Sequence, residues 1–313
     1  MSETAIAVDM GGSHVEFGIV REDRVMASET FTVSEPTLRA VLPKLEGCIP
    51  ALAAKCGIEL RKMAGIALGI CAIVDGRSRV LAANGKYDDG IGFDFSQRSE
   101  SSFGLPCRVE NDTRLALLGE HFAGEAKGFD DAALITLGTG IGGAVMLGGE
   151  LLVSGGHKAG GLAGHLGVAW NGRLCSCGNR GCAEAEASTA SLDSICRKRE
   201  GFAKSVLASA TKAIDFRSLF AAIEQGDRLA RDVLDHCIGI WSALTVSLIH
   251  AYDPRVIVFG GGVMKRHGAI LPLIREHVDR YAWAEKGSVK IVPTALGSSA
   301  ALLGAIPLLR GRA

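Results

Sequence analysis

The chain has 313 residues, of which 48% are hydrophobic, and its 34 Lys and Arg residues balance 34 Asp and Glu residues. This length and apolar content predict a large core and two domains. The zero formal net charge argues against a nucleic-acid partner, because proteins that bind phosphate backbones usually carry a basic excess.

The start of the chain and its cysteines predict a compartment. Residues 1–8 lack the basic start and long apolar run of a signal peptide, and no uninterrupted apolar run reaches the ~18 residues of a membrane span. The nine cysteines are an odd number, and several stand in apolar stretches, as Cys71 and Cys237 do. We therefore expect a cytoplasmic protein with no membrane partner, reduced thiols and some cysteines kept for a metal.

The first half of the chain predicts a strand meander, a helix and further strands. The periods of its apolar residues predict strands over 5–9, 15–20, 25–33, 63–70 and 107–110, and helices over 38–56 and 111–122. Asn111 or Asp112 is the predicted N-cap of the second helix. No Pro/Ser-rich linker or low-complexity segment interrupts the pattern.

The second half repeats the opening of the first. Strands are predicted over 132–137, 142–147, 256–259 and 289–293, and helices over 229–252, 269–281 and 299–309. A strand, a glycine-rich turn and another strand thus occur twice, which suggests two related lobes that grip phosphate between them.

The two glycine-rich turns predict phosphate binding. The sequences are Asp9-Met10-Gly11-Gly12-Ser13 and Leu137-Gly138-Thr139-Gly140-Ile141-Gly142-Gly143. Successive backbone N–H groups in such a turn attract an anion, and Ser13 and Thr139 add hydroxyl donors. For either turn alone an ordinary hairpin is the simpler interpretation, and the pair favours phosphate.

Two other nucleotide-binding motifs do not fit the chain. It has no Gly-x4-Gly-Lys-Ser/Thr sequence, and the Gly138 turn leads into a strand where a dinucleotide motif needs a helix. A third cluster, Gly260-Gly261-Gly262, follows a strand and has room for a flat adenosine, although a simple strand-to-loop connection fits it equally well.

A cysteine cluster predicts a structural zinc site. Cys175, Cys177 and Cys182 lie within eight residues, and His165 precedes them by ten. Three thiolates and one imidazole satisfy tetrahedral Zn²⁺ and leave no open position, so a zinc hydrolase is not expected. The alternative is a set of unrelated thiols on a polar loop, where free cysteines are prone to oxidation.

One carboxylate stands where a phosphoryl-transfer base is needed. Glu110-Asn111-Asp112 places it between a strand and a helix. Phosphoryl transfer requires a group that orients the attacking hydroxyl and accepts its proton. Taken alone, this aspartate is equally explained as a helix cap.

Together these motifs resemble the ROK (repressor, open reading frame, kinase) family of sugar kinases over nearly the whole chain. The resemblance implies an α/β, actin-like, hexokinase-type (ribonuclease H-like) fold with two lobes and an interlobe cleft. The smaller lobe would be residues 1–122 with 299–313, and the larger one 123–298. Family members are often homodimers, so a homodimer is expected.

The resemblance also implies a role for each matching residue. Asp112 would be the general base for transfer of the γ-phosphoryl group of ATP, and Asp9 would lie near Mg²⁺. The other expected contacts are with the sugar (Asn84, Asn111, His165, Glu184), the phosphates (Gly11, Gly12, Ser13, Gly138, Thr139, Gly140), adenosine (Gly261, Gly262) and zinc (His165, Cys175, Cys177, Cys182).

Several positions depart from the family pattern. Leu162 replaces a Glu that binds sugar hydroxyls, Cys71-Ala72 replaces Pro-Gly, His14 replaces Lys, Arg114 replaces Asn, and Gly297-Ser298 replaces Gly-Asp. A buried hydroxyl left unpaired costs ~1–3 kcal/mol, so Leu162 changes the expected sugar preference. Lys86, Asp88 and Asp89 are expected on a solvated loop, with substrate contacts as the alternative.

The expected activity is an ATP-dependent kinase that acts on O6 of a hexose or hexose-like sugar. A catalytically weak sugar sensor of the same fold is the alternative suggested by Leu162. A DNA-binding repressor of the same family is not expected, since Asp9 opens the kinase motifs almost at the first residue.

Overall fold

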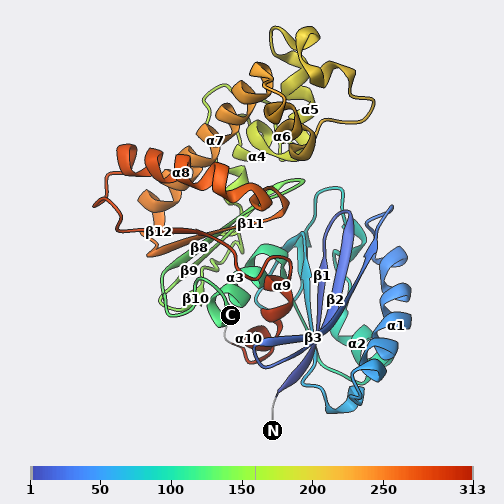
Figure 1. Ribbon diagram of the computed structural model, residues 1–313. Coiled ribbons are helices and arrows are strands. Elements are labelled where there is room, and N and C mark those ends of the chain that lie inside the picture. The colour runs from blue at the N-terminus through green and yellow to red at the C-terminus, as the bar shows by residue number, and fades with distance from the viewer. Residues whose placement is uncertain (1–2, 159, 312–313) are drawn as a thin grey trace. The chain divides into compact units, whose positions relative to one another are not determined.

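The computed structural model describes residues 3–158 and 160–311, and the chain divides into two compact units. Unit 1 contains residues 1–134, 144–161 and 294–313, and unit 2 contains 135–143 and 162–293. The chain forms two five-stranded sheets, each with parallel and antiparallel neighbours and with helices packed against it (Figure 1).

Unit 1 is built around a five-stranded sheet of order β3-β2-β1-β4-β7. Its strands are β1 (Thr4–Met10), β2 (His14–Arg21), β3 (Arg24–Thr32), β4 (Ile66–Ile70) and β7 (Cys107–Asn111). β1 to β3 form the predicted antiparallel meander, and β4 and β7 continue parallel to β1. The interior strand β4 is buried at every residue, as a strand covered on both faces is, whereas the edge strand β3 alternates, as a strand covered on one face does.

Helices cover both faces of this sheet (Figure 1). α1 (Leu38–Lys55) and α2 (Phe95–Phe103) lie on one face, and α3 (Asp112–Ala123), α9 (Ser299–Leu303) and α10 (Ala305–Leu309) lie on the other. The predicted helix 299–309 is divided at Gly304. Pro307 has no N–H to donate to the carbonyl of Leu303, so the ladder loses a bond there. Small elements complete the unit: η1 (Leu60–Lys62), β5 (Ile73–Val74), β6 (Val80–Ala82) and η2 (Asp88–Gly90).

The second sheet has the order β10-β9-β8-β11-β12. Its strands are β8 (Ala132–Leu137), β9 (Ile141–Leu147), β10 (Glu150–Leu151), β11 (Val256–Gly260) and β12 (Lys290–Pro293). The division between the units passes through β8 and β9, so their turn, residues 138–140, belongs to unit 2.

The helices of unit 2 are α4 (Ala183–Ala187), α5 (Thr189–Lys198), α6 (Phe216–Glu224), α7 (Arg228–Tyr252) and α8 (His267–Tyr281), with the short turns η3 (Ala163–His165), η4 (Phe202–Lys204), η5 (Val206–Ser209) and η6 (Gly262–Arg266). Among the described helices, α7 alone has the length and apolar content of a membrane span. Its Trp241 side chain is fully buried and donates to the carbonyl of Ala187 at 3.1 Å, which is how a core helix behaves.

Residues 144–161 group with α3 in unit 1. The guanidinium of Arg114 on α3 donates to the carbonyls of Leu152 (3.4 Å) and His157 (3.2 Å). These bonds tie the segment to the helix, and nothing in the local sequence indicates them.

Helices α2, α4, α5 and α6 were not predicted from the sequence. The sequence of α6 does carry the helical period, with Phe216, Leu219 and Phe220 buried. α2 carries none: its sequence FSQRSESSF is mostly polar, and only Phe95 and Ser99 are buried. A helix with so little apolar surface has no 3.6-residue period to detect.

Candidate active site and metal centre

Asp112 begins α3, directly after the last strand of the first sheet. Asn111 is the N-cap of this helix, and its Oδ1 accepts from the N–H groups of Thr113 and Arg114, both at 3.1 Å. Its Nδ2 donates to the carbonyl of Ala72 at 3.2 Å. Of the two predicted N-caps, Asn111 is the one observed, so the Asp112 side chain is not needed as the cap.

The two oxygens of the Asp112 carboxylate have different surroundings. Oδ1 accepts from Thr113 N (2.8 Å), Asn111 Nδ2 (3.0 Å) and Thr113 Oγ1 (3.4 Å). All the hydrogen bonds that described residues make to this carboxylate end on Oδ1, so Oδ2 is the oxygen with capacity to accept a proton. Burial raises the pKa of Asp112, against the opposing effect of these donors and of the Lys86 charge.

Asp9 lies near Asp112, at the carboxyl end of β1, which β4 separates from β7. Burial, and then the charges of Asp112 and Glu16, raise the pKa of Asp9 to about 8. Its Oδ1 is buried and has no hydrogen-bond partner in the described chain. A buried carboxylate oxygen without a donor is costly unless a cation or a proton satisfies it.

The first glycine turn is fixed on one side by the side chain of Tyr87. The hydroxyl of Tyr87 donates to the carbonyl of Gly11 at 2.9 Å. In a trans peptide the next N–H points the opposite way, so the Gly12 N–H is directed away from Tyr87. Ser13 Oγ pairs with Nδ1 of His14 at 2.9 Å. The turn therefore presents at least one backbone donor toward a ligand.

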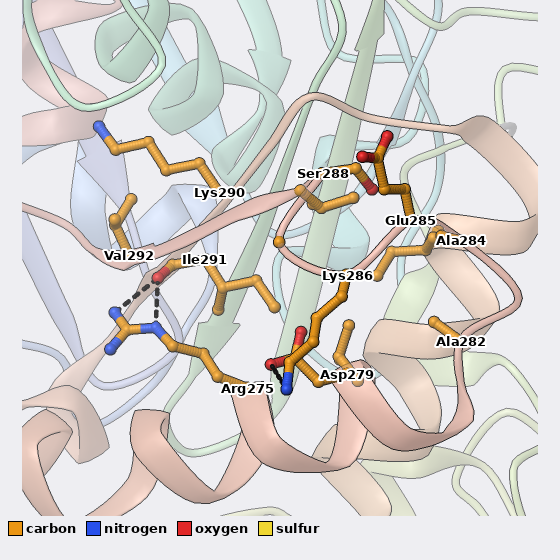
Figure 2. A pocket seen from close by; sticks show the side chains of 14 residues that line it. Arg275, Asp279, Ala282, Ala284, Glu285, Lys286, Ser288, Lys290, Ile291 and Val292 are labelled. Atoms are coloured by element: carbon orange, nitrogen blue, oxygen red, sulfur yellow. Dashed lines mark hydrogen bonds and ion pairs between the residues drawn. The ribbon is translucent and has the colours of Figure 1, made fainter.

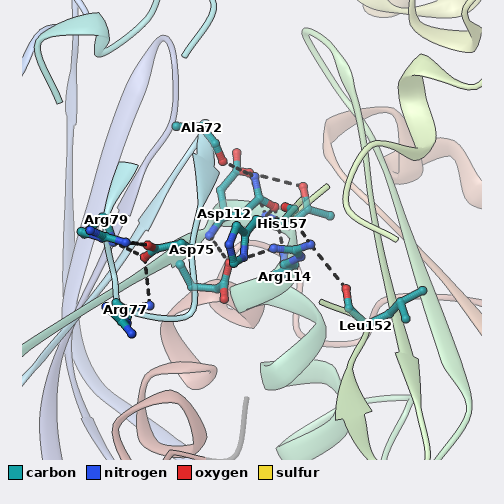
Figure 3. A network of polar contacts seen from close by, with 11 residues as sticks. Ala72, Asp75, Arg77, Arg79, Asp112, Arg114, Leu152 and His157 are labelled. Carbon is teal, nitrogen blue, oxygen red and sulfur yellow. Dashed lines mark hydrogen bonds and ion pairs between the residues drawn. The ribbon is translucent and has the colours of Figure 1, made fainter. Parts of the chain in front are cut away.

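Arg114 anchors a network of polar contacts in unit 1 (Figure 3). Its side chain is 2% exposed and lies 3.5 Å from the carboxylate of Glu110, which is 7% exposed. Burial raises the pKa of Glu110, and the charge of Arg114 opposes that shift. Figure 3 also shows Asp75, which lies between β5 and β6. Its carboxylate accepts hydrogen bonds from Arg79 Nε at 2.8 Å and from Arg77 N at 2.9 Å, and these bonds stabilise the turn between the two strands.

The second glycine turn is fixed by the start of α5. Thr189 N donates to the carbonyl of Gly138 at 3.1 Å, and Ala190 N donates to that of Thr139 at 3.0 Å. The following N–H groups, those of Thr139 and Gly140, consequently point away from α5. These two N–H groups are therefore left available to an anionic ligand.

Two predicted nucleotide motifs meet in unit 2. Gly261 has φ +87°, and a Cβ there would lie 2.7 Å from the backbone N and C of Leu137. Only glycine allows this approach. The third glycine cluster therefore packs directly against the entrance of the second glycine turn.

The Cys–His cluster is assembled as the spacing predicts. The ligand atoms of His165, Cys175, Cys177 and Cys182 all lie within 4.8 Å of one another. Cys177 Sγ is 3.7 Å from Cys182 Sγ, and Cys175 Sγ is 3.5 Å from His165 Nδ1. Zinc bond lengths of ~2.3 Å to sulfur and ~2.0 Å to nitrogen give tetrahedral edges of about 3.5–3.8 Å. The donor set therefore fits Zn²⁺.

The remaining predicted sugar residues fall in both units. Glu184 Oε2 accepts from Ile141 N at 2.9 Å, so this carboxylate also braces the second glycine turn. Asn84 is exposed on the loop after β6. Lys86 on that loop is not solvated as expected, because it is half-buried against Gly12. Leu162 is 36% exposed.

A separate cavity of about 360 Å³ lies between α8 and β12 in unit 2 (Figure 2). Arg275 donates to the carbonyl of Ile291 at 2.9 and 2.6 Å, and Lys286 pairs with Asp279 at 3.8 Å. The cavity is at the amino end of β12, whereas the glycines 260–262 follow the carboxyl end of the parallel strand β11. It is distinct from the predicted nucleotide motifs.

Comparison with known proteins decides the family. The ROK family model matches residues 5–312. A glucokinase of Thermotoga maritima is 31% identical, over 98% of this chain and 97% of its own length. The chain belongs to the ROK family. The crystal structure of a ROK family glucokinase from Streptomyces griseus, in complex with glucose and AMPPNP, has a TM-score of 0.79 and 29% identity, and the match covers 98% of this chain and 99% of that one.

The family also contains regulators. The xylose repressor of Bacillus subtilis is 27% identical over 76% of this chain and 59% of its own length. The two full-length matches to glucokinases confirm the predicted hexokinase-type fold and the predicted enzyme class, an ATP-dependent sugar kinase.

Proposed function

We propose that this protein transfers the γ-phosphoryl group of Mg-ATP to O6 of a hexose or hexose-like sugar, with Asp112 as the general base. The observation that carries the proposal is the asymmetry of the Asp112 carboxylate, whose Oδ1 takes three donors. Oδ2 is then positioned to accept the proton of the attacking hydroxyl. Burial raises the pKa of Asp112, which makes its carboxylate a stronger base than an exposed aspartate.

Asp9 is the residue that we expect to hold Mg²⁺ with the nucleotide. The unpartnered Oδ1 supports this role, since a divalent cation satisfies a buried carboxylate and lowers its pKa. When bound, magnesium would neutralise charge on the phosphates of ATP. Gly11, Gly12 and Ser13 in unit 1, and Gly138, Thr139 and Gly140 in unit 2, would bind those phosphates through backbone and hydroxyl donors.

The rest of the nucleotide and the sugar involve residues of both units. Gly261 and Gly262 would lie along adenosine, which the bare backbone of the third cluster supports. Asn84, Asn111, His165 and Glu184 remain the proposed sugar contacts. Because Asn111 and Glu184 already make hydrogen bonds within the chain, they would bind the sugar with the lone pairs or protons that remain.

We propose zinc at His165, Cys175, Cys177 and Cys182, on the basis of the tetrahedral distances. Its role would be structural, since four protein ligands close the site. His165 belongs to the short turn η3, three residues after Leu162. Zinc would hold the His165 imidazole in place. It would thereby also hold the segment that carries Leu162, which stands where the family pattern has a sugar-binding Glu. A cytoplasmic location remains a proposal that rests on the odd number of cysteines and their apolar surroundings, and a homodimer remains one that rests on the family resemblance.

The test is an assay of ADP release with Mg-ATP over a panel of sugars: glucose, mannose, allose, fructose and amino sugars. We expect turnover on at least one of them. If the pure, folded protein releases no ADP above its sugar-free rate with any member, while it binds one of them in calorimetry, the sugar-sensor alternative replaces the kinase. Phosphorylation at a carbon other than C6, read from the product by NMR, would refute the O6 assignment alone.

A further inference from the structure

The Lys86 side chain lies directly on the first glycine turn. A Cβ at Gly12 would overlap Lys86 Nζ, and it would lie 2.5 Å from Cε and 2.6 Å from Cδ. The lysine stem therefore fills the space that a side chain would occupy at that position. Its half-buried ammonium sits at the backbone of a turn that is already proposed to bind phosphate.

The neighbouring residues fix the loop that carries Lys86. Tyr87 is 0% exposed, its N–H donates to the carbonyl of Pro36 at 2.6 Å, and its hydroxyl donates to Gly11. Asp89 accepts from the N–H groups of Leu38 (2.9 Å) and Arg39 (3.0 Å) at the start of α1. These contacts hold Lys86 at the turn, so little entropy is lost when it binds an anion.

Among the residues that the structure describes, the Lys86 ammonium has no carboxylate partner at bonding distance. No acidic side chain of residues 3–158 or 160–311 is paired with Lys86 within 4.0 Å, although its charge is felt at Asp112 and at Cys71. A half-buried cation that is held in place without a counterion is poised for an anionic ligand.

We infer that Lys86 contacts the transferred phosphoryl group of the nucleotide and stabilises its charge in the transition state. The inference rests on the proposed function. In that reaction the bond from the γ-phosphorus to the β–γ bridging oxygen breaks, and a bond from the sugar oxygen to the γ-phosphorus forms. The sugar hydroxyl proton passes to Asp112. Lys86 stays protonated throughout and donates hydrogen bonds to the phosphoryl oxygens.

The test compares Lys86→Met and Lys86→Arg with wild type, and with Lys127→Met, which removes an exposed lysine elsewhere in unit 1. Loss of one preorganised donor to a transition-state oxyanion lowers kcat by ~100-fold or more. We expect that loss in Lys86→Met, a sugar KM within about 3-fold of wild type, partial recovery in Lys86→Arg and no change in Lys127→Met.

Calorimetry with ATP and AMP supplies an arm that does not depend on turnover. We expect Lys86→Met to weaken ATP binding and to leave AMP binding unchanged. An unchanged kcat and ATP affinity would overturn the inference, as would a raised sugar KM with kcat preserved, since that pattern marks a contact with the acceptor. If wild type itself turns over no sugar, the proposed function fails, and the ATP and AMP affinities still decide whether Lys86 meets phosphate. A misfolded Lys86→Met protein, seen by its melting curve, is replaced by Lys86→Gln.

Discussion

Asp9 and Asp112 face one another across Gly69: a Cβ at that glycine would lie 3.6 Å from Asp9 Oδ1 and 3.4 Å from Asp112 Cα. The parallel register explains the arrangement, because Asp9 pairs with Gly69 and Gly69 pairs with Glu110 across three adjacent strands. Two carboxylates this close repel one another when both are charged. The repulsion is relieved when one binds a cation and the other accepts a proton.

The first prediction concerns the proposed base. We expect Asp112→Asn to lower kcat by ~100-fold or more, because the amide cannot accept the hydroxyl proton, while the sugar KM changes little. Steady-state ADP release on the best sugar measures this. Asp94→Asn is the matched control, since Asp94 caps α2 and Asn caps equally well. Turnover in Asp112→Asn equal to that of wild type would refute the assignment.

The second prediction is a pH dependence of stability from Asp9. Its pKa is about 8 in the folded protein and near 3.8 in the unfolded chain, so the folded state holds more protons between those values. The free energy of unfolding therefore falls as the pH rises from about 4 to 8. Without added Mg²⁺ we expect a decrease of at least ~1.4 kcal/mol, the free energy of one pKa unit.

Urea unfolding at pH 5, 6, 7 and 8 measures that decrease. Asp9→Asn removes the titrating group, so its stability should depend less on pH than that of wild type. Added Mg²⁺ should stabilise wild type more at pH 8 than at pH 5, and it should not do so in the variant. A wild-type stability that rises over this range without added Mg²⁺ contradicts the prediction.

The third prediction concerns metal content. Elemental analysis should find about one zinc per chain, as four protein ligands require. Cys177→Ser should lose the metal and lower the melting temperature, because binding energy of the metal is folding energy. Cys56→Ser, which replaces a half-buried thiol outside the cluster, should keep the metal and the melting temperature of wild type. If wild-type protein without zinc is as stable as wild-type protein with zinc, the zinc site is excluded.

The fourth prediction isolates the buried pair of Arg114 and Glu110. Arg114→Leu leaves Glu110 as a buried carboxylate without its cation, which we expect to cost ~3–5 kcal/mol of unfolding free energy. Glu110→Gln combined with Arg114→Leu should recover part of that loss. Arg197→Ala removes another i,i+4 pair, with Asp193, at an exposed position, and it should cost less than ~1 kcal/mol. Equal losses in the two arginine variants would show that burial is not the cause.

The fifth prediction concerns substrate choice at Leu162. Leu162→Glu supplies a carboxylate that accepts hydroxyl hydrogen bonds, so we expect the preference among hexoses, measured as kcat/KM ratios, to shift by about ten- to a hundred-fold. Leu166→Glu, where the leucine is equally exposed at 36%, is the control. Identical preferences in wild type and Leu162→Glu would show that position 162 does not contact the sugar.

Local sequence determined the elements with strong periodicity and the sites with short spacing. The meander from β1 to β3, helix α1 and the long helix α7 follow from apolar residues that repeat every two or every 3.6 positions. The zinc cluster follows from three cysteines on one tight loop, because so short a loop restricts where their sulfur atoms can lie. The polar helix α2 carries no such pattern, and the sequence did not predict it.

Tertiary structure alone decided the rest, since it depends on pairs of residues far apart in the chain. The proximity of Asp9 to Asp112 requires the parallel register of β1, β4 and β7, which no local pattern specifies. The place of Lys86 on Gly12 depends on Tyr87, whose hydroxyl reaches a carbonyl 76 positions earlier. Residue type and spacing set which groups the chain carries, and the burial of the sheet and its helices decides which of them meet and which charges lose their water.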